Sequence, residues 1–299
     1  MTEPILFGRE RPLSVLRAAV SRTFGGQGGL VLVSGEPGIG KTALVSEAAV
    51  EAKRRGALAL SGTCWDGDSR PGYWPWVQVL RGLQRSVPDS WSRIQEVGGD
   101  TLATLFGASS TTLSGQDPSF QMCDTISRAL LEVAQLQPVV VVLDDLHWAD
   151  AASFRVLEFL ARHLALERLL IVATYRDIEL ELVDHPLRSG LLALIPKASP
   201  IVLAGLDVES TARLIGYAAD RQPDTRVVSE LQRTTGGNPF FIQQAALLWA
   251  ANSSIAAITP AVHEAIERRL ARLESTTIDV LLWAAVAGYE FEPDLLAAT

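Results

Sequence analysis

The residues with the clearest chemical potential form the stretch GEPGIGKT at positions 35–42, between an apolar run and a segment rich in alanine. The stretch matches G-x-x-x-x-G-K-[ST], in which glycines let backbone N–H groups come close to an anion. Lys41 would reach the β- and γ-phosphates of a nucleotide, and the hydroxyl of Thr42 would bind Mg²⁺. The only other lysines are Lys53 and Lys197, so a lysine at this point needs its own explanation.

The whole loop is expected to bind nucleotide, because the helix that starts near its end directs a positive dipole at the same place. The alternative is a glycine-rich turn beside an unrelated lysine. A predicted strand before the loop and a predicted helix after it argue against that alternative. The residues that we expect to bind nucleotide are Gly35, Glu36, Pro37, Gly38, Ile39, Gly40, Lys41, Thr42 and Ala43.

A second candidate element is LDDLHWAD, which follows an apolar run of valines. Asp144 ends the predicted strand and would bind Mg²⁺ through water, while Asp145 is placed to orient or deprotonate an attacking water. Two adjacent acids at the end of an apolar strand would be costly without a cation nearby. The alternative is an acidic turn that only ends the strand. His147 follows closely, and we interpret it as a packing residue rather than a catalytic one.

A third element, TYRD, follows the next predicted strand and contains Arg176. This arginine would lie beside the two acids at the carboxyl edge of a parallel sheet, where ligands bind. We favour a role as sensor of the γ-phosphate, because a guanidinium binds phosphate through two parallel hydrogen bonds. The alternative is a salt bridge to Asp177 or Asp145. Together, Asp145, Lys41 and Arg176 are the predicted catalytic residues, and Thr42 and Asp144 the predicted metal ligands.

Apolar runs that alternate with helical segments predict a parallel α/β sheet with right-handed crossovers. Residues 98–118 are rich in Gly, Ser and Thr and predict a loop. Strand signals stop after about residue 205, so we expect a boundary near 204 and a helical second part. The predicted strands are 29–35, 57–64, 138–145, 169–176 and 200–206.

Composition excludes several classes of protein. A net charge of −8 over 299 residues disfavours a nucleic-acid surface on this segment. Two cysteines form no disulfide or metal framework, and no apolar run is long enough to cross a membrane. We therefore expect a reduced, cytoplasmic protein with no membrane partner. The sequence stops within a predicted helix, so we expect it to be part of a longer protein.

The motifs FGRE (7–10), GEPGIGKT, LDDLHWAD, TYRD and GGNPFF (236–241) occur in series. Together they resemble the STAND class of AAA-related P-loop ATPases, and most of all the large ATP-binding regulators of the LuxR type. The resemblance implies a P-loop core of five parallel strands in the order 5-1-4-3-2, an all-helical lid and the start of a winged-helix domain. The implied domains are residues 1–204, 205–275 and 276–299.

The resemblance also implies contacts to the adenine base. These would come from Phe7, Gly8 and Arg9 and, in GGNPF, from Pro239. GGNPF can also be interpreted as a helix stop followed by a helix start, with proline in the first turn, and both interpretations can be true together. The chain departs from many hydrolytic relatives outside the class at Asp145, where they use glutamate. Any DNA contact would need a domain that is absent from this sequence.

Three functions remain in competition. The first is a regulatory switch that binds ATP or ADP, hydrolyses ATP slowly and self-associates in the ATP state. The second is a dedicated AAA-type ATPase or motor. The third, a P-loop kinase, lacks an evident acceptor site. Turnover separates the first two, because dedicated phosphoryl-transfer enzymes reach roughly 1–100 s⁻¹.

Overall fold

In the computed structural model the chain forms two compact units. Residues Met1–Ala204 are the core unit, and residues Gly205–Thr299 are the C-terminal unit. The residues that the structure describes are 6–65, 72–107, 118–177, 185–252, 273, 277–278 and 280–282.

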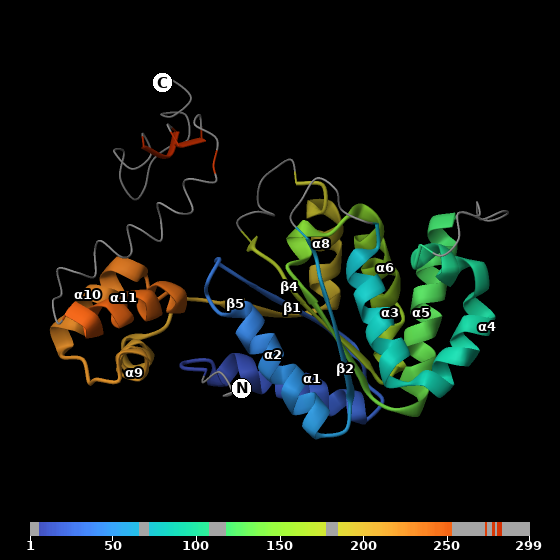
Figure 1. Ribbon diagram of the computed structural model, residues 1–299, viewed down its shortest axis with the longest axis horizontal. Coiled ribbons are helices and arrows are strands. Elements are labelled where there is room, and N and C mark those ends of the chain that lie inside the picture. Colours follow the sequence, from blue (N-terminus) through green and yellow to red (C-terminus); the bar gives the residue numbers. More distant parts are fainter. Residues whose placement is uncertain are drawn as a thin grey trace. The chain divides into compact units, whose positions relative to one another are not determined.

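The core unit is built on a five-stranded parallel sheet (Figure 1). Its strands are β1 (Gly29–Gly35), β2 (Leu58–Thr63), β3 (Val139–Asp144), β4 (Leu169–Thr174) and β5 (Ser199–Leu203). The spatial order is β2-β3-β4-β1-β5, which reads 5-1-4-3-2 from the other edge, the order that the family resemblance implied. Because all neighbouring strands are parallel, the segments that follow β1, β3 and β4 leave the same edge of the sheet.

Helices cover both faces of this sheet (Figure 1). The helices of the core unit are α1 (Glu10–Phe24), α2 (Lys41–Arg54), α3 (Trp74–Ser86), α4 (Pro88–Leu105), α5 (Pro118–Leu136), α6 (Ala151–Ala161) and α8 (Arg188–Leu194). Short 3₁₀ turns are η1 (Leu146–Trp148), η2 (Leu164–Leu166) and η3 (Ile195–Lys197).

Two separate apolar clusters result from the alternation of side chains along the strands. Val140 and Val142 of β3 pack with α1 and α2 on one face. Val141 and Leu143 of the same strand pack with α3, α5, α6 and α8 on the other face. A strand buried on both sides must be apolar throughout, which is why the valine run before Asp144 shows no polar alternation.

The loop predicted over 98–118 is wrong in its first part, because α4 extends to Leu105. The helix is bent at Gly99, whose φ of 38° and ψ of −123° are not helical. Ile94 and Leu102 on either side of the bend are buried in the core, so tertiary packing overrides the weak helix propensity of the glycines. The rest of the predicted loop, 108–117, lies outside the described residues.

The two edge strands of the sheet, β2 and β5, differ in what happens to their outer backbone N–H and C=O groups. At the β2 edge, the side-chain amide of Gln78 accepts a hydrogen bond from the N–H of Thr63 at 3.4 Å and donates one to its carbonyl at 2.9 Å. At the β5 edge, Pro200 lacks an N–H group, and Val202 is exposed. Proline within a sheet is typical of an edge strand.

The C-terminal unit is helical over its described part. Its helices are α9 (Val208–Ala219), α10 (Thr225–Thr235) and α11 (Pro239–Asn252). The side chains of Asp207 and Asp224 cap α9 and α10 by accepting hydrogen bonds from backbone N–H groups at 2.7 and 2.8 Å. Nearly all of the winged-helix segment expected at 276–299 lies outside the described residues.

The turn between α10 and α11 contains the glycine pair of the GGNPF motif. Gly236 ends α10 in the left-handed conformation, and Pro239 begins α11, so the motif is a helix stop followed by a helix start. Gly237 also has a positive φ of 78°, and a Cβ there would lie 2.4 Å from the carbonyl oxygen of Leu206. The glycine pair therefore permits a close backbone approach within this unit.

No helix in the described part of the chain is both long and apolar enough to cross a membrane.

Candidate functional site

The predicted phosphate loop connects β1 to α2 at the carboxyl edge of the sheet. The φ values of Gly35, Gly38 and Gly40 are 142°, 82° and 101°, which residues other than glycine rarely adopt. A Cβ on Gly35 would also lie 2.6 Å from the carbonyl oxygen of Leu203 on β5. The first glycine is thus required both by its backbone conformation and by the neighbouring strand.

Lys41 is the first residue of α2, and its side chain lies within the loop. Its Nζ donates to the carbonyl oxygens of Gly35 at 2.6 Å and Glu36 at 2.9 Å, and only 6% of the residue is exposed. One of its three donors has no acceptor among the described residues. Burial lowers the pKa of Lys41 first, and the positive charge of Arg176 lowers that pKa further. The loop therefore holds a cation at its centre, with a second cation nearby.

The two predicted metal ligands meet in the structure although 102 positions separate them. The hydroxyl of Thr42 donates to Oδ2 of Asp144 at 2.9 Å. Thr174 donates to Oδ1 of the same carboxylate at 2.5 Å, and its Oγ1 accepts the N–H of Asp145 at 2.9 Å. Both oxygens of Asp144 are thus held by hydroxyl groups, and one of these is the predicted magnesium ligand.

Thr174 was not among the residues predicted from the sequence. It ends β4, and its register follows from the pairing of Leu143 with Ala173, which places it beside Asp144. The signal was present as a polar residue at the end of an otherwise apolar strand, just before Tyr175 and Arg176. Strand register was needed to interpret it, and a single sequence does not supply that register.

Asp145, the predicted base, follows β3 directly and is half-buried. Its φ of 57° and ψ of 49° are left-handed, a conformation that aspartate tolerates better than most residues. Its Oδ1 lies 3.9 Å from Nε2 of His147. The negative charge of Asp145 raises the pKa of Lys41, so this carboxylate and the loop lysine share one electrostatic environment.

His147 is buried in the 3₁₀ turn after β3, with its ring centroid 5.2 Å from that of Trp148. Burial lowers the pKa of His147 to about 3, and the positive charges of Arg176 and Lys41 act in the same direction. The imidazole is therefore neutral at physiological pH, in keeping with a packing role.

Arg176 lies two residues beyond β4 and is partly buried. Its charge lowers the pKa of both Lys41 and His147, so it faces the same region as the phosphate loop. Asp145, Asp177 and Asp144 act on the pKa of Lys41 in the opposite direction, so cations and carboxylates gather at this edge of the sheet, as they do in many functional sites.

Arg9 of the FGRE motif is almost fully buried, at 6% exposure. Its Nη1 donates to the carbonyl oxygen of Ala204 at 2.8 Å, and its Nη2 donates to that of Ile39 at 2.9 Å. Gly8 has a positive φ of 63°, and Phe7 is half-buried. Pro239 belongs to the other unit, so its expected approach to these residues stays a prediction.

The residues present fit a nucleotide with Mg²⁺. A glycine loop, two cations, a hydroxyl group and a carboxylate face one edge of the sheet. In the described part of the chain, no three His, Cys, Asp or Glu side chains form a group that could hold a metal ion by itself. Mg²⁺ needs no such group, because it keeps several waters and takes further oxygens from phosphates.

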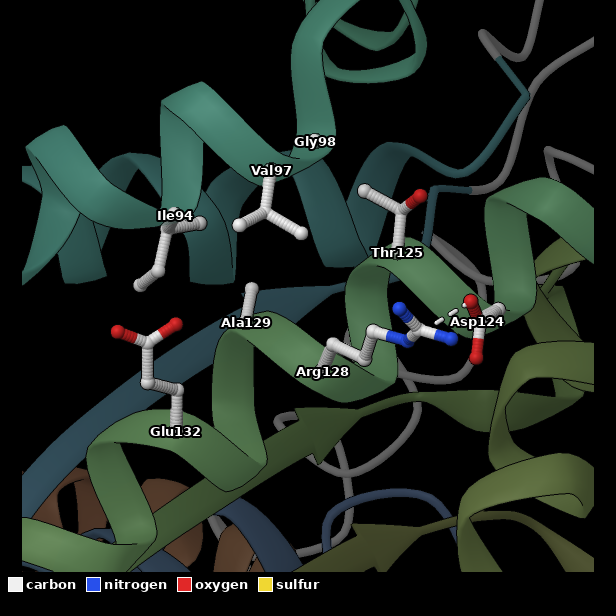
Figure 2. A pocket seen from close by; sticks show the side chains of 8 residues that line it. All are labelled: Ile94, Val97, Gly98, Asp124, Thr125, Arg128, Ala129 and Glu132. Carbon is white, nitrogen blue, oxygen red and sulfur yellow. Dashed lines mark ion pairs between the residues drawn. The ribbon is translucent and has the colours of Figure 1, made fainter.

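A different concavity lies between α4 and α5 (Figure 2). Its lining residues are Ile94, Val97, Gly98, Asp124, Thr125, Arg128, Ala129 and Glu132. Its charges are neutralised locally, because Arg128 pairs with Asp124 at 2.9 Å and Arg93 pairs with Glu132 at 3.6 Å. We assign it no function.

Comparison with known proteins gives several relatives of this architecture. An uncharacterized protein of Rhizobium meliloti (strain 1021) is 26% identical over 98% of this chain, which spans only 30% of that protein's length. A Walker-type ATPase of Pyrococcus abyssi is similar in structure, with a TM-score of 0.59 and 15% identity, over 98% of this chain and 87% of that one.

A second structural neighbour is the ORC2 protein of Aeropyrum pernix in its ADPNP–ADP complexes, with a TM-score of 0.56, 15% identity and coverage of 100% and 80%. A STAND protein with a tetratricopeptide repeat sensor from Pyrococcus horikoshii follows, with a TM-score of 0.52, 16% identity and coverage of 98% and 36%. At these identities the neighbours show the fold alone. Residues 5–172 match the family described as the AAA ATPase domain, so the chain belongs to the AAA ATPase domain family.

Proposed function

We propose that this chain is an ATP- and ADP-binding regulatory switch that hydrolyses ATP slowly, and that it forms part of a signal-responsive transcriptional regulator of the LuxR type. The observation that carries the nucleotide site is the hydrogen bond between Thr42 and Asp144. It joins the end of the phosphate loop to the carboxylate at the end of β3, as a phosphate-bound magnesium ion would require of its two protein partners.

Each site residue has a separate role in this proposal. The loop and Lys41 bind the phosphates, and Arg176 contacts the γ-phosphate. Thr42 and Asp144 would hold Mg²⁺, which when bound neutralises charge on the β- and γ-phosphate oxygens. Asp145 orients the attacking water and accepts its proton. The support for this division is that the charges of Arg176 and Asp145 both act on Lys41 and that Thr42 is hydrogen-bonded to Asp144.

Slow turnover and switching are the finer parts of the proposal. A carboxylate at Asp145 is one methylene shorter than the glutamate of many hydrolytic relatives, which favours slow water activation. The two compact units provide parts whose arrangement a nucleotide would control. We propose residues 205–275 as a lid and 276–299 as the start of a winged-helix domain, with any DNA contact made outside this chain and a cytoplasmic location.

Calorimetry and turnover together test the nucleotide site and its class. We expect parent protein to bind ADP and Mg²⁺–ATP and to turn over far below the roughly 1–100 s⁻¹ of dedicated phosphoryl-transfer enzymes. A rate within that range would favour the dedicated ATPase instead. Light scattering with ADP and with a non-hydrolysable ATP analogue tests self-association, which we expect only with the ATP analogue.

The adenine clamp has its own test. We propose that Phe7, Gly8 and Arg9 hold the base from the core unit and that Pro239 holds it from the C-terminal unit. ADP should then raise the melting temperature and slow proteolysis of residues 204–210, since a ligand stabilises the arrangement to which it binds. Pro239→Gly should reduce both effects while phosphate binding persists. A variant with both effects intact would exclude the clamp.

A further inference from the structure

The buried guanidinium of Arg9 joins two backbone segments that lie far apart in the sequence. One nitrogen donates to Ile39 within the phosphate loop, and the other donates to Ala204, the last residue of the core unit. The two contacts span 30 and 195 positions. A guanidinium is planar and rigid, so it fixes the two carbonyl groups relative to each other in a way that a flexible ammonium does not.

Residues immediately after Ala204 are held just as closely, but by the C-terminal unit. The N–H of Leu206 donates to the carbonyl oxygen of Gly237 at 2.7 Å, and its carbonyl accepts from Nε2 of Gln232 at 2.8 Å. A Cβ on Gly205 would lie 2.0 Å from the carbonyl oxygen of Gly236. Ala204 is therefore hydrogen-bonded to Arg9 within the core unit, and Leu206, two residues further along the chain, is hydrogen-bonded to the GGNPF turn within the C-terminal unit.

Burying this cation is unfavourable in itself, since burial lowers the pKa of Arg9. No carboxylate in the described part of the chain forms an ion pair with it, so its compensation comes from two carbonyl dipoles and from the negative charge of Glu10, which raises the pKa of Arg9. A role in adenine binding alone would not require that both ends of the guanidinium contact the backbone. Its position between the loop and the junction calls for another explanation.

We propose that Arg9 is a positioning residue that transmits occupancy of the phosphate loop to the 204–206 junction. The inference rests on the proposed nucleotide binding and deepens it by identifying how the loop and the C-terminal unit are coupled. Phosphate binding orders the loop and with it the peptide of Ile39. Arg9 then restrains Ala204, and the covalent chain passes this restraint to Leu206 and Gly237. Coupling of this kind needs a direct measurement rather than a path of contacts alone.

Hydrogen exchange followed by mass spectrometry gives that measurement, at saturating ADP so that affinity does not matter. In the parent, ADP should slow exchange in residues 36–43 and also in residues 203–208. In Arg9→Lys, which keeps the charge and the aliphatic stem, slowing at 36–43 should persist while slowing at 203–208 falls below about twofold. Arg11→Met, on the exposed side of the same helix, is the matched control and should behave as the parent does.

The outcomes separate this inference from the proposed function. If ADP slows exchange in neither segment of the parent, both the nucleotide site and this inference are wrong. If ADP protects 36–43 but not 203–208 in the parent, nucleotide binding stands and the coupling is refuted. Equal protection of 203–208 in Arg9→Lys and the parent also refutes it, and leaves Arg9 as an adenine or packing residue.

Discussion

Two charged regions of the core unit differ in how their charges are balanced. At the carboxyl edge of the sheet, Lys41 and Arg176 are close enough that one lowers the pKa of the other. Between α4 and α5, by contrast, Arg128 and Asp124 form their own ion pair on the protein surface (Figure 2). At the first region, burial and Arg176 lower the pKa of Lys41 while Asp145, Asp177 and Asp144 raise it, so charges of both signs gather around one buried lysine, whereas the second region holds a simple surface ion pair. A buried cation among several charged groups, rather than the presence of a hollow, is what distinguishes the candidate site.

The largest expected effect is a loss of ATP hydrolysis when Asp145 at the candidate site is changed. Asp145→Asn keeps the shape of the side chain and removes the base, so turnover should fall by about 100-fold or more while Mg²⁺–ATP affinity is retained. Single-turnover kinetics and calorimetry measure the two quantities. Asp124→Asn, in the other region, is the control and should hydrolyse ATP as the parent does.

Parent-like turnover in Asp145→Asn would place the base elsewhere. Asp150 would be the next candidate by sequence, but both of its carboxylate oxygens accept hydrogen bonds from Ser153, at 2.9 and 2.5 Å, as the cap of α6. Such a cap is poorly placed to take a proton from water, which makes the Asp145 test the more decisive one.

The next largest effect concerns the loop cation. Lys41→Ala should weaken ATP and ADP binding at least tenfold, in line with the loss of a charge-assisted contact of about 1.5–3 kcal/mol. Lys53→Ala removes an exposed lysine from the same helix and should leave the affinity unchanged. Equal affinities for Lys41→Ala and the parent would contradict the assignment of the phosphate loop.

The third effect is a pH dependence of the free energy of unfolding that comes from His147, which lies near the candidate site. Its folded-state pKa of about 3 lies below the ordinary value of 6.5, so the unfolded chain binds the proton more readily. The stabilising contribution is complete above pH 6.5 and is lost as pH falls toward 3. Between pH 7 and pH 5 this group should cost roughly 2 kcal/mol of unfolding free energy.

Urea unfolding at the two pH values checks this prediction. His147→Gln should show a smaller loss than the parent between pH 7 and pH 5, whereas His163→Gln, at an exposed histidine, should show the parent's loss. The same acid sensitivity in His147→Gln and the parent would mean that other groups account for all of it.

The smallest effect is expected in the balanced region. Arg128→Ala removes a surface ion pair in which the arginine side chain is 66% exposed, so unfolding free energy should change by less than about 1 kcal/mol. Nucleotide affinity should not change. A clear loss of affinity in this variant would show that the α4–α5 region is connected to the site after all.

Local patterns were enough to predict the strands, the phosphate loop and the two acids after β3. A loop at Gly35–Thr42 and a strand end at Asp144 each depend on residues that are adjacent in the sequence. Parallel strands then bring the two together, because their carboxyl ends share one edge. The contact between Thr42 and Asp144 was thus predictable from strand ends alone.

Other features depend on contacts that sequence alone does not contain. Gly98 and Gly99 suggested a loop, because the burial of Leu102 that keeps α4 folded is a tertiary effect. Thr174 required the register of β3 against β4. The carbonyl partners of Arg9 required both the loop and the end of β5 to be in place. The relation of Pro239 to the adenine site remains a prediction.

The edges of the sheet bear on how copies of the protein meet. An open parallel sheet offers unpaired N–H and C=O groups at its two outer strands, which invite intermolecular strand addition and, from there, aggregation. Here the side-chain amide of Gln78 forms hydrogen bonds with the backbone N–H and C=O groups of Thr63, as a neighbouring strand would. Pro200 leaves one position of β5 without an N–H donor. Both devices oppose growth of the sheet from one molecule into the next. The self-association proposed above would accordingly use surfaces other than these two outer strands, which limits its continuation into fibrils.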